Sequence, residues 1–153
     1  MLASRRQVLV GAVVALTSAC DLRDERGGPT AEPTPTPTDR LLAAAAARER
    51  ALLAAYDDVL ARHPDLAARL SPYREDHAAH LQAVEPGAVV SATVAPSAAR
   101  TPRPTQVALR RRLRVLEQEA ADTYARAAVG APAEHAALLA SLAACEASHA
   151  DLL

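Results

Sequence analysis

The sequence predicts an all-α protein, and three observations lead to that prediction. Alanine and leucine, which are strong helix formers, dominate the chain from residue 39 onward. Apolar residues there recur at steps of three and four, which places them on one face of a helix. No segment of useful length alternates between apolar and polar residues, as a half-buried strand would. Residues 39–153 of this 153-residue chain are long enough for one hydrophobic core, so we expect a single helical domain.

The first two helices are expected to form a hairpin. The first covers residues 39–62, because Asp39 suits the N-cap and a His-Pro pair ends the pattern. The second covers residues 64–84. Pro72 lies inside it and is expected either to kink the helix or to restart it, with Ser71 as a local cap.

The last two helices follow a long connection. Residues 85–103 are punctuated by proline and show no periodicity, and a loop of this length is explained by a crossover along a helical bundle. The third helix starts at Pro104, since proline is tolerated in a first turn, and runs to about Val129. A turn at residues 130–132 leads to the fourth helix, from Ala133 to the end of the chain.

The N-terminal segment has the pattern of an export signal. Arg5 and Arg6 precede an apolar run, residues 8–19, that is too short to span a bilayer. The surrounding letters SRRQVL resemble the twin-arginine motif. The letters LTSAC, which end at Cys20, resemble a bacterial lipoprotein box, in which the cysteine is acylated and becomes the mature N-terminus. The alternative is a plain signal peptide over residues 1–20 with an incidental cysteine.

Residues 21–38 then form a Pro/Thr-rich segment that favours an extended, disordered tether. At about 3.1 Å per residue, this tether would hold the domain up to roughly 50 Å from its anchor. We therefore expect an exported protein on the outer face of the cytoplasmic membrane, attached through a lipid on Cys20.

The charge balance argues against one class of partner. The chain has 17 arginines and 18 acidic residues, for a formal net charge of −1. Nucleic-acid-binding domains are normally basic. We therefore expect no nucleic-acid partner, and the sequence identifies no protein partner.

Polar residues interrupt the apolar stripes of all four helices. A carboxylate in such a stripe must find a partner on another helix, bind a metal or take up a proton. A Glu and a His three residues apart, pointing into a bundle, form the ligand unit of carboxylate-bridged metal sites. The candidate ligands are Glu49, His77, His80, Glu117, Glu146 and His149. Glu119 is an open alternative to Glu117.

The positions of these residues along the helices support a common site. Glu49 and His77 lie equally far in sequence from the first hairpin turn, and Glu117 and Glu146 lie at similar distances from the second. With a rise of about 1.5 Å per residue, each pair is expected at nearly the same height. Such a donor set suits iron, manganese or zinc better than copper or calcium.

Two alternatives to a metal site remain open. The carboxylates and imidazoles could form a metal-free buried network that satisfies the same hydrogen bonds. His149 could instead lie in a frayed last turn, where a cationic side chain is favourable. The three tyrosines are expected to fill the core with their hydroxyls bonded at its rim: Tyr56, Tyr73 and Tyr124.

Three segments carry a family resemblance: YDDVLARHPDLAARLSPYREDHAAHL, LEQEAADTYARAA and ALLASLAACEASHADLL. They resemble the small ferritin-like domains of actinobacterial exported lipoproteins, a family with no assigned activity. The resemblance covers residues 40–153. It implies a ferritin-like four-helix bundle with a long connection between helices 2 and 3.

The wider ferritin-like superfamily implies a di-iron site, with a Glu from each of two helices and a Glu-x-x-His from each of the other two. Glu49 and Glu117 would be the single glutamates, and Glu146 with His149 would be the fourth-helix pair. The second helix departs from the pattern, because His77 stands where a bridging carboxylate is expected. The departure leaves open a single-metal site or an abandoned one. The competing functions are a lipid-anchored metal-binding bundle, without assignable catalytic residues, and a metal-free interaction module of the cell envelope.

Overall fold

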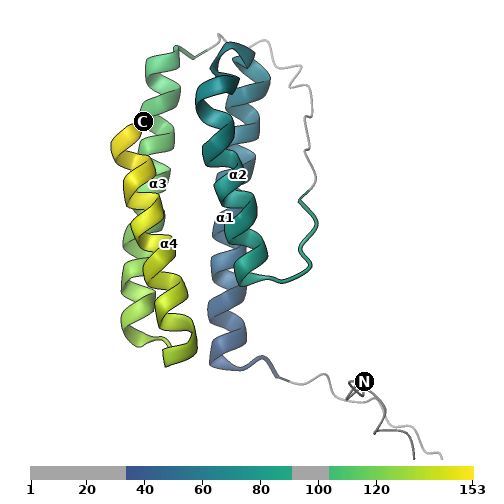
Figure 1. Cartoon of the computed structure of the whole chain (residues 1–153), viewed down its shortest axis with the longest axis vertical. Coiled ribbons are helices and arrows are strands. Elements are labelled where there is room, and N and C mark those ends of the chain that lie inside the picture. Colours follow the sequence, from purple (N-terminus) through teal and green to yellow (C-terminus); the bar gives the residue numbers. More distant parts are fainter. Residues whose placement is uncertain (1–33, 91–103) are drawn as a thin grey trace, which may run out of the picture. The chain divides into compact units, whose positions relative to one another are not determined.

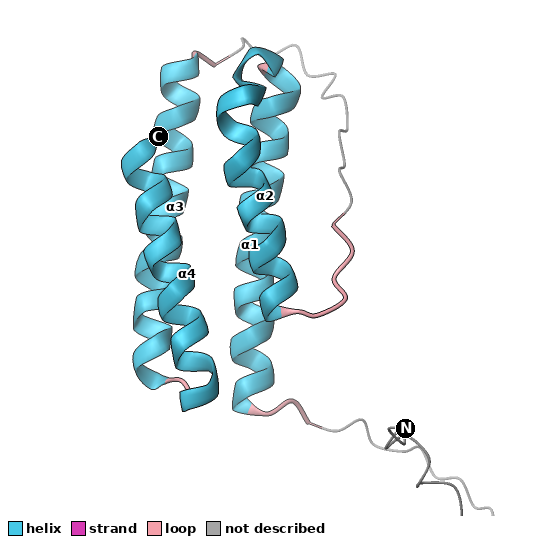
Figure 2. Ribbon diagram, in the orientation of Figure 1, coloured by secondary structure: helices cyan, strands magenta, loops and turns pink. Residues whose placement is uncertain are grey.

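A computed structural model describes residues 34–90 and 104–153, and in this part of the chain the only regular secondary structure is helical, as predicted (Figure 2). Its elements are α1 (Pro37–Arg62), the 3-10 turn η1 (Pro64–Leu66), α2 (Ala67–Val84), α3 (Gln106–Gly130) and α4 (Ala133–Leu152). None of these helices is long and apolar enough to cross a membrane. The predicted leader with Arg5, Arg6 and Cys20, most of the tether, and residues 91–103 lie outside the described residues.

The helices form a bundle in which α1 and α4 run in one direction and α2 and α3 run in the other (Figure 1). The side-chain amide of Gln106 donates to Asp65 Oδ2 at 2.6 Å, which places the start of α3 beside the turn between α1 and α2. The chain leaves α2 at the far end of this hairpin and must return to that turn. The end of α2 and the start of α3 therefore lie at opposite ends of the bundle, which is consistent with the predicted crossover.

The start of α1 differs from the prediction. Thr36, not Asp39, is the N-cap, and Pro37 occupies the first turn. The Thr36 hydroxyl accepts from the Asp39 amide at 3.1 Å, while Asp39 Oδ2 accepts from the Thr36 amide at 2.8 Å. This reciprocal capping box satisfies two amides that would otherwise lack partners. The helix therefore takes in the last residues assigned to the tether.

Two further helix starts also need correction. Helix α2 runs without interruption through Pro72, so Ser71 is not a cap and the predicted restart is wrong. Proline has no N–H, so only the hydrogen bond from residue 72 to the carbonyl of Ala68 is missing, in the first turns of the helix. The remaining hydrogen bonds keep the helix continuous. Pro104 precedes α3 rather than opening it, because the Thr105 hydroxyl accepts from the amide of Ala108 at 3.2 Å and caps the helix.

The core consists of two apolar clusters, one toward each end of the bundle. The first is built mainly from buried side chains of all four helices: Ala45, Ala46, Leu52, Leu53, Leu81, Val84, Ala88, Ala120, Tyr124, Leu139 and Leu142. The second gathers near the turn between α1 and α2: Tyr56, Val59, Leu66, Leu70, Leu109, Leu113 and Leu153. On α2, α3 and α4 the polar residues predicted to face inward lie between these two clusters in sequence, and on α1 Glu49 lies between Ala46 and Leu52 of the first cluster. Apolar side chains therefore flank them on both sides.

Candidate metal centre

All six candidate ligands point into the bundle. Four of them have no exposed surface at all: Glu49, His77, Glu117 and Glu146. His149 is 4 % exposed, and the side chain of His80 is 15 % exposed. Glu119 faces solvent, so the structure decides the open choice on α3 in favour of Glu117.

His77 lies at the middle of the cluster and joins α1 to α3. Its Nδ1 is 3.0 Å from Glu49 Oε2, and its Nε2 is 3.0 Å from Glu117 Oε1. The two ring nitrogens point in different directions, so one imidazole contacts a carboxylate on each side. The expected match in height between Glu49 and His77 is confirmed, and the second hairpin is level with them.

Glu146, on α4, contacts the two remaining histidines, His80 on α2 and His149 on α4. Its Oε1 is 3.0 Å from His80 Nδ1 and 3.6 Å from His77 Nδ1. Its Oε2 is 3.3 Å from His149 Nδ1. The carboxylate of Glu146 therefore presents one oxygen toward His80 and the other toward His149.

Two tyrosines complete the cluster, and the sequence analysis missed their role. The Tyr56 hydroxyl donates to Glu117 Oε1 at 2.5 Å, and the Tyr124 hydroxyl donates to Glu49 Oε1 at 2.6 Å. Both hydroxyls are therefore bonded deep in the core. The prediction that they would be bonded at its rim is wrong for these two tyrosines. Partners of this kind fix the orientation of a metal-binding carboxylate and commonly affect metal affinity.

A sequence signal for these tyrosines exists. The same spacing, Glu-x6-Tyr, separates Glu49 from Tyr56 on α1 and Glu117 from Tyr124 on α3. Seven residues are nearly two helical turns, so each Glu and Tyr share a face. Because α1 and α3 run in opposite directions, the tyrosine of each helix reaches the glutamate of the other.

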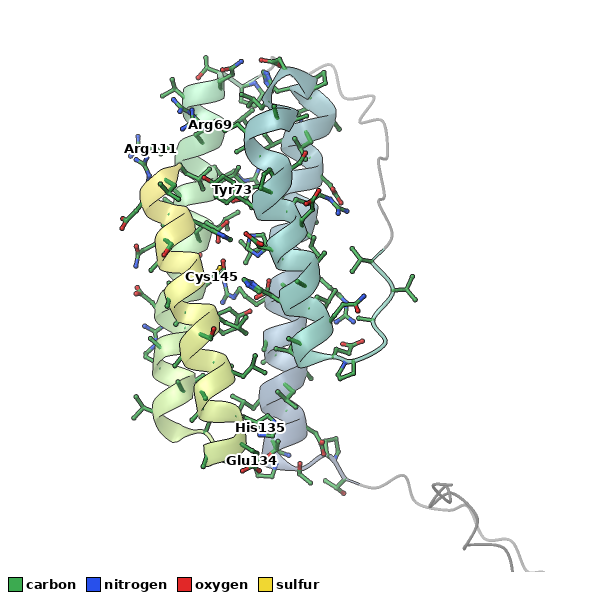
Figure 3. The ribbon with its side chains drawn as sticks, viewed as in Figure 1. Arg69, Tyr73, Arg111, Glu134, His135 and Cys145 are labelled. Atoms are coloured by element: carbon green, nitrogen blue, oxygen red, sulfur yellow. The ribbon has the colours of Figure 1, made fainter. Side chains whose placement is uncertain are left out.

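His149 connects the buried cluster to the protein surface. It lies within α4 and is buried, so the frayed-turn alternative is wrong. Its Nε2 is 3.2 Å from Asp76 Oδ2 and 3.5 Å from Cys145 Sγ, and its ring packs edge-on against Tyr73 at 4.8 Å between ring centres. Tyr73 and Cys145 are labelled in Figure 3, in the seam between α2 and α4. Cys145 is thus partly exposed at the edge of the core.

The environment shifts the pKa of several of these groups. Burial lowers the pKa of His77, but the hydrogen bonds to Glu117 and Glu49 and the negative charges of Glu117 and Glu146 outweigh burial and raise it to about 10. Burial raises the pKa of Glu117, and the neighbouring His77 offsets this only in part. Burial also opposes ionisation of Glu146, yet the neighbouring imidazoles of His149, at 3.3 Å, and His80, at 3.0 Å, hold its pKa well below the usual range.

The outer groups are also shifted. Burial lowers the pKa of His149, but its contact with the Glu146 carboxylate and the charge of Glu117 raise it above the ordinary value. Burial, together with the charge of Glu146, raises the pKa of the Cys145 thiol to about 11. Cys145 is therefore a neutral thiol at physiological pH, and not a reactive thiolate.

Three buried atoms of this cluster have no hydrogen-bond partner within the described part of the chain: Glu117 Oε2, Glu146 Oε2 and His149 Nδ1. The last two lie 3.3 Å apart without forming a hydrogen bond. Buried polar atoms almost always have a hydrogen-bond partner. Three unpaired atoms that can each donate a lone pair to a metal therefore indicate a place where a bound cation would supply the missing partner. The donors form two overlapping groups whose ligand atoms lie within 4.8 Å of one another. One group is Glu49, His77, His80 and Glu146, and the other is His77, Glu117, Glu146 and His149. The residues present therefore could hold a metal ion.

Comparison with known proteins adds no relative: no protein-family model, curated protein or solved structure matches this chain.

Proposed function

We propose that this protein is a ferritin-like helical bundle that binds a divalent transition-metal ion between its four helices. The observation that carries the proposal is the set of unpaired buried donors, Glu117 Oε2, Glu146 Oε2 and His149 Nδ1. They lie beside His77, which completes a group of four ligands. Leaving these three atoms unpaired would cost the fold free energy, because buried polar atoms without hydrogen-bond partners are unfavourable.

The donor chemistry limits the choice of metal. A mixture of carboxylate oxygens and imidazole nitrogens suits iron, manganese and zinc, whereas calcium prefers oxygen alone. When bound, iron or manganese would supply redox chemistry and zinc would supply Lewis acidity. The chain's own contribution would be to hold the ion in a dry pocket, with Tyr56 and Tyr124 orienting two of the carboxylates.

Topology supports the ferritin-like assignment. A bundle with one long connection along its length, between the second and third helices, is the arrangement of ferritin-like folds. The single glutamates on α1 and α3 and the Glu146-x-x-His149 pair on α4 follow the expected ligand positions. The helix α2 departs from them, since His77 occupies the position of a carboxylate. Membership of the family of exported lipoproteins with such domains remains part of this proposal.

Metal content is the direct test. The protein is purified without chelator, its metal content is measured by mass spectrometry, and its unfolding is followed with added Fe(II), Mn(II) or Zn(II). A metal at one hundred times its dissociation constant should stabilise the fold by about 2.7 kcal/mol. Glu146→Ala should abolish this gain, whereas Glu119→Ala, which alters an exposed glutamate on α3, should retain it.

The competing function is a metal-free interaction module of the cell envelope. One observation favours it: both nitrogens of His77 already lie at hydrogen-bonding distance from glutamates, so part of the cluster is satisfied without an ion. The same experiment separates the two functions. Absence of metal from the purified protein, with no stabilisation by any of the three ions, would leave only the interaction module.

We also propose that the bundle is exported and held at the outer face of the cytoplasmic membrane by a lipid on Cys20. The support is the sequence alone: Arg5 and Arg6 before an apolar run, and the lipoprotein-box pattern that ends at Cys20. Cys20→Ser should release the protein from the membrane fraction. Unchanged membrane association of that variant would contradict the acyl anchor.

A further inference from the structure

We infer that Asp76, Cys145 and His149 form an outer metal site, which takes a thiophilic divalent cation such as Zn²⁺. The three side chains lie in the seam between α2 and α4, at the edge of the core (Figure 3). Their ligand atoms are within 4.8 Å of one another. The inference goes beyond the proposed function, which uses carboxylates and imidazoles inside the bundle and no sulfur. We call these three residues the outer site.

Local structure brings these residues together. Cys145 and His149 are four residues apart on α4, so they lie on the same face of that helix. Asp76 lies on α2 and reaches across the seam, where its Oδ2 is 3.2 Å from His149 Nε2. The same nitrogen is 3.5 Å from Cys145 Sγ. One imidazole nitrogen therefore faces both a sulfur atom and a carboxylate oxygen.

The distances between these atoms match the coordination of a tetrahedral ion. Zinc binds a thiolate sulfur at about 2.3 Å, and an imidazole nitrogen or a carboxylate oxygen at about 2.0 Å. Tetrahedral angles then separate the sulfur from the nitrogen by about 3.5 Å, and the nitrogen from the oxygen by about 3.3 Å. The observed separations are 3.5 Å and 3.2 Å. The Asp76 side chain is 54 % exposed, so it can also turn toward the sulfur without disturbing the core.

The donor atoms determine which ions the outer site accepts. A thiolate favours zinc and other soft cations over manganese, magnesium and calcium, which prefer oxygen ligands. The Cys145 thiol releases its proton to solvent when its sulfur binds the ion. Three protein ligands at a partly exposed position leave the fourth coordination position to water. The outer site should therefore bind zinc and reject manganese, which the buried cluster could hold.

His149 also belongs to the buried cluster, but a neutral ring binds a metal through one nitrogen only, because the other carries the proton. When Nε2 binds the outer ion, the proton lies on Nδ1, which faces Glu146 Oε2 at 3.3 Å. A carboxylate behind a ligating histidine is the usual arrangement at metal sites. The outer ion thus withdraws His149 from one of the two buried ligand groups. It shares no residue with the other group: Glu49, His77, His80 and Glu146.

The test is a titration of the full chain with Cd²⁺, whose bond to a thiolate gives an ultraviolet charge-transfer band. The parent chain carries Cys20→Ser, so that Cys145 is its only thiol. The band should appear with the intensity of one thiolate per chain, and Cys145→Ser should abolish it. Zn²⁺ should displace Cd²⁺ and remove the band, whereas an equal concentration of Mn²⁺ should leave it.

Asp76→Asn and Glu75→Gln are a matched pair, since each neutralises one exposed carboxylate on α2. Asp76→Asn should raise the dissociation constant for Cd²⁺ at least about 10-fold, and Glu75→Gln should leave it unchanged. Glu117→Gln alters the buried cluster but not the outer site, so it should retain the band. Circular dichroism verifies that each metal-free variant folds, and the band of the parent chain remains decisive if a variant does not.

A thiol that is only hydrogen-bonded to His149 would give no band in the parent chain, and that result would overturn the inference. Equal affinity of the two matched variants for Cd²⁺, or loss of the band in Glu117→Gln, would also overturn it. The proposed function is measured separately, by the stabilisation that Mn²⁺ gives and by that of Zn²⁺ in the Cys145→Ser variant. Stabilisation without a band would leave the proposed function intact, and a band without stabilisation would support the outer site alone.

Discussion

The hydrogen bond from Tyr56 to Glu117 gives the sharpest test of the cluster as a stabilising element. The bond is 2.5 Å long, both residues have no exposed surface, and the acceptor is a carboxylate. Buried hydrogen bonds to charged groups contribute about 1.5–3 kcal/mol. Because Glu117 Oε1 keeps its contact with His77 at 3.0 Å, the lower half of this range applies, and we expect Tyr56→Phe to lower the free energy of unfolding by about 2 kcal/mol.

Tyr73→Phe is the matched control. The Tyr73 ring packs against Tyr56 at 6.3 Å between ring centres, but its side chain is only half-buried, and no hydrogen bond of its hydroxyl is found in the described residues. Removing that hydroxyl should change the free energy of unfolding by less than about 0.5 kcal/mol. Urea denaturation in the presence of chelator measures both variants, with an unchanged m-value as the sign that the folded state is comparable.

The same variant should also weaken metal binding. The Tyr56 hydroxyl orients the carboxylate of Glu117, and loss of such a partner typically costs 10–100-fold in metal affinity. Competition against a chelator of known affinity measures this change. Equal stability and equal metal affinity for Tyr56→Phe and Tyr73→Phe would refute the role given to the buried hydroxyl.

Further predictions concern other parts of the molecule. Thr36→Ala, which removes the N-cap of α1, should cost about 1 kcal/mol in urea denaturation. Leu139→Ala, at a position with no exposed surface, should cost about 2–5 kcal/mol by the same measurement. Glu117→Gln should lower Zn²⁺ affinity in calorimetry, whereas Glu119→Gln should not. With chelator present, the raised pKa of His77 stabilises the fold fully below about pH 6.5, and this stabilisation should be lost as the pH rises toward 10; a flat urea midpoint across that window would contradict it.

Much of the fold follows from local patterns in the sequence. The periodicity of alanine and leucine predicted all four helices because a packed helix must bury one face, and the spacing of three and four residues records that face. The helix starts were less predictable. Thr36 and Asp39 are both good cap residues, and their reciprocal hydrogen bonds, together with Pro37 at the first position, decided between them. Pro72 was misjudged because its helical neighbours retain the rest of the hydrogen-bond ladder.

The inward direction of the site residues could also be predicted, because each interrupts an apolar stripe. The choice between Glu117 and Glu119 could not, since it depends on the rotation of α3 about its own axis, which packing against the other helices fixes. The sequence also did not reveal that His77 would contact glutamates on both sides. That arrangement needs the height of α3 relative to α1 and α2, which the long connection leaves undetermined in the sequence.

Protons and metal ions are best understood as alternative occupants of the same cluster. Without metal, protons compensate the negative charge of the glutamates: the neighbouring carboxylates raise the pKa of His77, and burial raises the pKa of Glu117. A bound cation takes over this compensation and removes the reason for those protons to stay. The hydrogen-bonded network is therefore compatible with a metal centre as well as with a metal-free module, because three buried carboxylates and three imidazoles satisfy one another when no ion is bound. Which occupant prevails depends on whether the affinity of the cluster for a cation exceeds its affinity for protons at the pH of the compartment.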